Sequence, residues 1–107
     1  MASKAEDLTI EYEEDGVLVV EELDKIILSK RGAWATVLFK YRQWEKAKDG
    51  YGHDRYSIRR YRKMGEEYRP QGKFNISSKD QATKIVSALQ KWIAEAVDGG
   101  GADEEED

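Results

Sequence analysis

The fold is decided by residues 33–45, AWATVLFKYRQWE, in which side chains of two kinds alternate along the chain. Successive residues of an extended chain point to opposite sides of a sheet. One side would carry Ala35, Val37, Phe39 and Tyr41, and the other Trp34, Thr36, Leu38, Lys40, Arg42 and Trp44. The stretch therefore predicts a long β-strand with one core-facing side and one wetter side.

Shorter patterns on both sides of this stretch predict further strands. Residues 17–20 and 26–28, on either side of a charged connection that contains Asp24, predict one or two strands. Residues 55–64 and residues 73–76 predict one strand each. Gly50 and Gly52 indicate a loop over residues 46–54, and Pro70 indicates a connection over residues 65–72. We expect an antiparallel sheet of about four to five strands.

A C-terminal helix completes the predicted α+β fold. Ser78 and Gln81 have the spacing of a capping box, and Gly99 marks the expected end of the helix. The apolar positions recur every three or four residues, as one face of a helix requires: Ala82, Ile85, Val86, Leu89, Trp92, Ile93, Ala96 and Val97. A stripe this wide predicts a homodimer interface at Ile85, Leu89, Trp92 and Ile93.

Charge divides the 107 residues into three segments. Residues 1–25 carry a net charge of −7, residues 26–73 carry +8 and residues 74–107 carry −5. We predict one domain over residues 16–98, between a disordered acidic arm at residues 1–15 and a Gly-rich acidic tail at residues 99–107. The arms either keep the chain soluble or compete with nucleic acid for the basic segment.

Residue types that support catalysis or cofactor binding are scarce. The chain has no cysteine and one histidine, His53, in a Gly-containing polar stretch, so no disulfide, thiolate zinc site or acid–base pair is expected. No run of about 20 apolar residues predicts a membrane span. The sequence predicts a non-enzymatic protein without cofactor, metal or membrane association.

The basic segment instead interleaves cations with flat rings. Cations neutralise phosphates, and Tyr or Trp rings stack on unpaired bases, so the pattern favours single-stranded DNA or RNA with little sequence preference. The candidate residues are Lys40, Arg42, Trp44, Arg55, Arg59, Arg60, Tyr61, Arg62, Lys63, Arg69 and Lys73. The alternative is a protein-interaction module whose basic face docks an acidic partner, with some rings belonging to the core.

The order of motifs resembles the transcriptional coactivator positive cofactor four family. The resemblance spans about residues 25–97 and is carried by residues 26–28, 37–44 and 72–77, followed by the amphipathic helix. It implies a curved antiparallel sheet with one helix, a homodimer and binding of single-stranded DNA. Arg42 and Trp44 match the family's DNA-facing Arg and aromatic residue, and Lys73 matches a basic residue of the final strand.

The long segment between Trp44 and Gly72 departs from the family pattern. The resemblance also implies a role in transcription, replication or repair, with the transcription machinery as a further partner. The expected location is the nucleoid in a bacterial cytoplasm, or the nucleus in a eukaryote.

Overall fold

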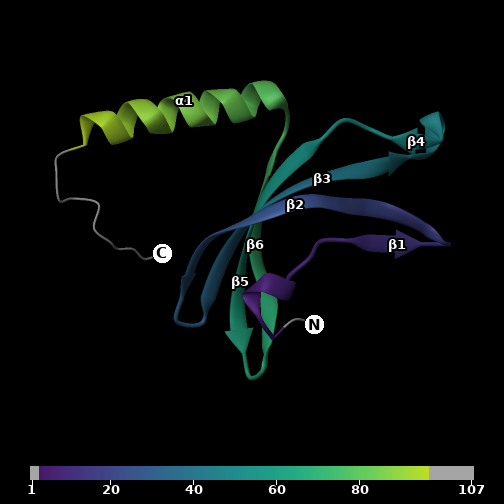
Figure 1. The fold of residues 1–107 in the computed structure, drawn as a ribbon, viewed down its shortest axis with the longest axis horizontal. Coiled ribbons are helices and arrows are strands. Elements are labelled where there is room, and N and C mark those ends of the chain that lie inside the picture. Colours follow the sequence, from purple (N-terminus) through teal and green to yellow (C-terminus); the bar gives the residue numbers. More distant parts are fainter. Residues whose placement is uncertain (1–2, 97–107) are drawn as a thin grey trace. The chain divides into compact units, whose positions relative to one another are not determined.

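The computed structural model describes residues 3–96 and divides the chain into two compact units, one ending at Ser77 and one beginning at Ser78 (Figure 1). The first unit is a six-stranded, curled antiparallel sheet with strand order β1-β2-β3-β5-β6, in which β4 also pairs with β3. The strands are β1 Tyr12–Glu14, β2 Val17–Arg31, β3 Trp34–Glu45, β4 Gly50–Tyr51, β5 Arg55–Met64 and β6 Glu67–Ile76. The predicted α+β class, a curved antiparallel sheet followed by one helix, is confirmed.

Tight turns connect neighbouring strands and fix their register. Asp15 and Gly16 join β1 to β2 with φ angles of 52° and 80°. Two successive positive φ values match the twist of flanking strands, and an Asp-Gly pair adopts them readily. Strand pairing therefore begins immediately at Glu14 and Val17.

Strands β2 and β6 are longer than the apolar runs that predicted them. Residues 17–31 form one strand, and the charged segment at Asp24 lies inside it, where the register shifts between Glu22 and Asp24. A bulge accommodates an extra residue without ending a strand, so of the one or two strands predicted here the structure has one. Likewise β6 begins at Glu67, because Pro70 lies on an edge strand next to a register shift, where proline is tolerated.

The N-terminal segment is part of the fold, so the predicted disordered arm at residues 1–15 was wrong for the described residues 3–15. Residues Ala5–Asp7 form a 3-10 helix (η1), and both Ala5 and Leu8 are buried in the core. The Lys25 ammonium on β2 donates hydrogen bonds to the carbonyl oxygens of Glu6 and Leu8. Three apolar side chains, Ala5, Leu8 and Ile10, hold an otherwise acidic segment against the sheet.

The sheet has two distinct faces, which we name the core face and the tryptophan face. The predicted alternation of β3 is confirmed, because Ala35, Val37, Phe39 and Tyr41 are all buried on the core face. Trp34 and Trp44 lie on the opposite, tryptophan face of the same strand. Directly opposed residues of an antiparallel ladder share a face, so the strand registers assign the remaining side chains.

The second unit is α1, Lys79–Glu95, which confirms the predicted helix. The Ser78 hydroxyl accepts a hydrogen bond of 3.0 Å from the Gln81 amide, as the capping pattern predicts. The helix closes at Ala96, while Val97, the proposed stop at Gly99 and the acidic tail lie outside the described residues. None of the helical segments within residues 3–96 has the length and apolar character that a membrane crossing requires.

Candidate nucleic-acid interface

The eleven predicted binding residues divide between the two faces of the sheet. Lys40, Arg42, Trp44, Arg60, Arg62 and Arg69 belong to the tryptophan face, whereas Arg55, Arg59, Tyr61, Lys63 and Lys73 belong to the core face. Residues adjacent in β5 therefore serve different surfaces. The structure does not gather the predicted set into one continuous site.

A row of cations surrounds Trp34 at one end of the tryptophan face. Arg31, Trp34, Arg62 and Arg69 are directly opposed across β2, β3, β5 and β6. The guanidinium carbon of Arg60 lies 4.4 Å from the centroid of the Trp34 ring, and that of Arg62 lies 5.5 Å away. We call these five residues the Trp34 cluster.

The charge of the Trp34 cluster is largely positive. Arg69 pairs with Glu67 at 3.9 Å, with both side chains about half exposed, so water weakens this pair. Guanidinium groups over an indole ring are stabilised by the ring's π electrons and keep their N–H donors at the ring edge. The cluster thus combines flat groups with hydrogen-bond donors that suit phosphate.

The middle of the tryptophan face is apolar. Beyond the row of Ser29, Thr36, Arg60 and Gly72, a cross-strand row consists of Ile26, Leu38, Ile58 and Phe74, of which Ile26 and Phe74 are each more than half exposed. Exposed apolar rows of this kind often mark surfaces that contact other molecules. The row separates the Trp34 cluster from the opposite end of the face.

That opposite end contains Trp44 and Tyr51, whose rings meet edge to face with centroids 5.2 Å apart. Arg42 lies over the Tyr51 ring at 4.1 Å and forms an ion pair with Glu21. Its neighbour Lys40 pairs with Asp54 at 3.6 Å. Carboxylates therefore oppose the cations here, and this end is less suited to a polyanion than the Trp34 cluster.

The predicted residues of the core face have mixed surroundings. Arg55 lies 4.0 Å from Glu45, and the Lys63 ammonium lies 5.6 Å from the centroid of the buried Tyr68 ring. Arg59 and Lys73 are directly opposed in the ladder between β5 and β6. These two cations line a cavity on the core face.

Tyr61 is a core residue, so its predicted role as a base-stacking ring was wrong. Its side chain is 6% exposed and packs in the same buried cluster as Phe39. Burial raises the pKa of the Tyr61 phenol above its usual value, the charge of Arg59 opposes this rise, and Glu22 adds to it. The phenol remains neutral at physiological pH.

Two residues of the Trp34 cluster, Arg31 and Trp34, were not among the predicted binding residues, and Trp34 is the central one. The alternation of β3 already assigned it to the same side as Arg42 and Trp44. Its pairing with Arg62 depends on the register of β3 against β5, which the sequence pattern did not give. The alternation that places Trp34 and Trp44 on the same side of the strand could have identified Trp34 as a candidate.

The predicted dimer residues occupy one stripe of α1. Ile85, Leu89 and Trp92 line a shallow groove along the helix, and Trp92 and Ile93 are 62% and 70% exposed.

Comparison of the chain with family models, curated proteins and solved structures gives no match.

Proposed function

We propose that the sheet unit binds single-stranded DNA or RNA without catalysis, and that the Trp34 cluster is the centre of the interface. The observation that carries this proposal is the pair of guanidinium groups at 4.4 and 5.5 Å from the Trp34 ring on a strand face rich in arginine. Stacking on an aromatic ring contributes about 1–3 kcal/mol per base and tolerates every base. Low sequence specificity follows.

The dimensions of the cluster suit an extended strand. Three inter-strand spacings separate Arg31 on β2 from Arg69 on β6, so the row is roughly 14 Å long. Phosphates can lie along the arginines while bases turn toward Trp34 or the apolar row at Leu38. A duplex hides its base faces, so single strands are the preferred ligand.

The resemblance to the positive cofactor four family supports the same proposal and extends it to a homodimer that acts in transcription, replication or repair. Each copy would contribute the apolar stripe of α1, including Leu89, Trp92 and Ile93, whose exposure is high for large apolar side chains. Sedimentation should detect a dimer at micromolar concentration. Trp92→Glu should shift it to a monomer, and a monomeric wild type would contradict the dimer.

The test of binding is a fluorescence anisotropy titration with matched single-stranded and duplex oligonucleotides at two salt concentrations. We expect tighter binding to the single strand. The double variant Arg60→Ala and Arg62→Ala should weaken binding and reduce the slope of log K against log salt by about 0.7 per lost phosphate contact. The control, Lys79→Ala with Lys91→Ala on α1, removes the same charge from the protein and should leave the slope nearly unchanged.

The second candidate function is docking of an acidic protein partner. A polyglutamate peptide offers charge without bases, so it separates the two functions. If the peptide binds as tightly as the single strand, and both respond equally to the arginine variants, the interface recognises charge alone. Equal affinity for duplex and single strand would also contradict the proposed function.

A further inference from the structure

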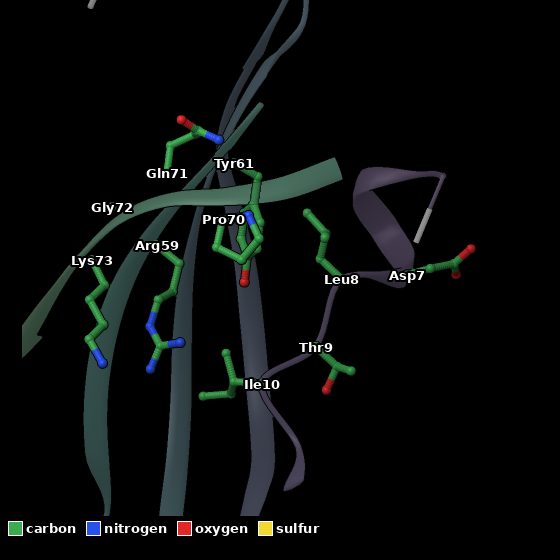
Figure 2. Close-up of a pocket in the computed structure, with 10 residues that line it drawn as sticks. All are labelled: Asp7, Leu8, Thr9, Ile10, Arg59, Tyr61, Pro70, Gln71, Gly72 and Lys73. Atoms are coloured by element: carbon green, nitrogen blue, oxygen red, sulfur yellow. The ribbon is translucent and has the colours of Figure 1, made fainter. Parts of the chain in front are cut away.

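A cavity of about 520 Å³ lies on the core face, between the N-terminal segment and β6 (Figure 2). Residues 7–10 form one wall, and Arg59 and Tyr61 of β5 with residues 70–73 of β6 form the other. This volume is within the range of roughly 300–1,000 Å³ that small-molecule sites occupy. The cavity is separate from the Trp34 cluster, which lies on the other face of the sheet.

The N-terminal wall is held in place by specific contacts. Leu8 is 3% exposed, and the Lys25 ammonium donates to its carbonyl oxygen. The Thr9 hydroxyl donates to a Glu22 carboxylate oxygen at 2.6 Å. The cavity is therefore preformed, which lowers the ordering cost of binding a ligand.

Two cations face the cavity from neighbouring strands. Arg59 and Lys73 are directly opposed, an arrangement that repels when no anion lies between the side chains. Within residues 3–96, neither has a carboxylate within ion-pair distance. The Asp7 side chain points away from both, as Figure 2 shows. The pair thus offers an unneutralised site for an anion.

Hydrogen bonds fix the orientation of Arg59. Its Nε donates to the Ser57 hydroxyl at 2.8 Å, and that hydroxyl donates to Oδ1 of Asn75 at 2.7 Å. The terminal nitrogens of the guanidinium remain available to a ligand. A planar fork of N–H donors matches two oxygens of a phosphate, and the Lys73 ammonium adds a compact charge.

The rest of the lining is apolar. Leu8, Ile10, Tyr61 and Pro70 contribute hydrocarbon surface next to the two cations. A ligand that fits both parts has a compact dianionic group attached to a less polar body. A phosphate monoester carries a charge of about −1.5 to −2 at neutral pH, which balances the two cations.

We propose that this cavity binds a phosphate monoester carried on a nucleoside, either a free mononucleotide or the 5′-terminal nucleotide of a single strand. The phosphate contacts Arg59 and Lys73, and the nucleoside packs against Ile10 and Pro70. This site does not depend on the Trp34 cluster. Internal segments of a strand lack a monoester, so they bind at the tryptophan face alone.

The test is a titration of the full chain, followed by ¹H–¹⁵N NMR, with inorganic phosphate, adenosine monophosphate, adenosine and an oligonucleotide with or without a 5′-phosphate. Adenosine monophosphate should produce saturable shifts at Arg59, Gly72 and Lys73. Adenosine should bind at least about 10-fold more weakly, the loss expected when a charge-assisted contact is removed. Inorganic phosphate should also bind more weakly, because it lacks the apolar contacts.

Arg59→Gln and Lys73→Gln should each weaken adenosine monophosphate binding by about 10-fold. The control Lys30→Gln changes an exposed cation on β2 that does not line the cavity and should leave binding unchanged. Thermal melts of each variant check that the sheet remains folded. Binding that survives both cavity variants, or adenosine that binds as tightly as its monophosphate, overturns the proposal.

Competition separates the two sources of the ligand. If the 5′-phosphorylated oligonucleotide displaces adenosine monophosphate and the unphosphorylated one does not, the cavity takes a strand terminus. If neither displaces it, the cavity takes a free mononucleotide. The cavity variants should leave the affinity for the unphosphorylated strand intact, so failure of this site is distinguishable from failure of the proposed interface.

Discussion

The core face and the tryptophan face of the sheet use similar side chains for different purposes. On the core face, Tyr61 is buried and packs in the same cluster as Phe39. On the tryptophan face, its sequence neighbours Arg60 and Arg62 lie over the ring of Trp34. Successive side chains of β5 point to opposite sides of the sheet. Tyr61 therefore packs in the core, whereas Arg60 and Arg62 lie on a surface that suits a ligand.

The comparison shows that cations and rings that interleave in a sequence need not interleave on a surface. Lys63 and Arg62 are consecutive, yet one approaches Tyr68 on the core face and the other approaches Trp34. The relevant pattern is read across the strands, where Trp34 is opposed to Arg62.

The largest difference should appear between Phe39 and Leu38, adjacent residues on opposite faces. Phe39 is fully buried, so Phe39→Ala should lower the free energy of unfolding by about 3–5 kcal/mol. Leu38 is only half-buried, and Leu38→Ala should cost about 1 kcal/mol or less. Urea unfolding followed by circular dichroism measures both. Equal losses would show that the sheet has two buried faces.

The N-terminal segment should contribute to the core face and not to the tryptophan face. Leu8→Ala should cost about 2–3 kcal/mol, because it leaves a cavity where the 3-10 helix packs. Leu23, which is 39% exposed in a bulge of β2, is the matched control and should lose about 1 kcal/mol or less. Urea unfolding followed by circular dichroism measures the loss of unfolding free energy in both variants. A neutral Leu8→Ala variant would return this segment to the role of a detachable acidic arm.

The two tryptophans of the tryptophan face should differ in nucleic-acid binding. Trp34→Ala removes the ring under Arg60 and should weaken single-strand binding by about 1–3 kcal/mol, with little change in salt dependence. Trp44 lies beside Tyr51, at the end of the face where carboxylates pair with the cations, so Trp44→Ala should weaken single-strand binding less than Trp34→Ala does. Anisotropy titrations of both variants measure the difference. A larger loss for Trp44→Ala would move the proposed centre to the opposite end of the face.

Local patterns predicted the elements whose structure depends on nearby residues. The alternation of residues 33–45 predicted β3, residues 55–64 match β5, and Ser78 caps α1 as expected. The prediction failed where distant contacts decide. The register shift at Asp24 is supported by pairing with β3, and Leu8 is buried by strands that follow it in the chain. Charge counting marked Arg60 and Arg62 but could not pair them with Trp34.

The smallest effect should come from Tyr61, and only at alkaline pH. Burial raises the pKa of its phenol above 10.0, so the folded state favours the neutral ring more than the unfolded state does. The stability that this preference supports is complete below about pH 10 and is lost as pH rises through the higher folded pKa. Tyr61→Phe keeps the ring but cannot ionise. At pH 7 it should differ from the wild type by less than about 1 kcal/mol.

Above pH 10 the two proteins should diverge, because the wild type loses stability through Tyr61 and the variant does not. Urea midpoints measured between pH 8 and about pH 11 would show a shallower alkaline decline in Tyr61→Phe. Tyr12→Phe is the matched control, since Tyr12 lies on the short strand β1 and its side chain is about half exposed. Parallel pH curves for the wild type and Tyr61→Phe would mean that the phenol reaches water. Tyr61 would then be a solvent-exposed ring of the core face, and the contrast in burial between the two faces would weaken at β5.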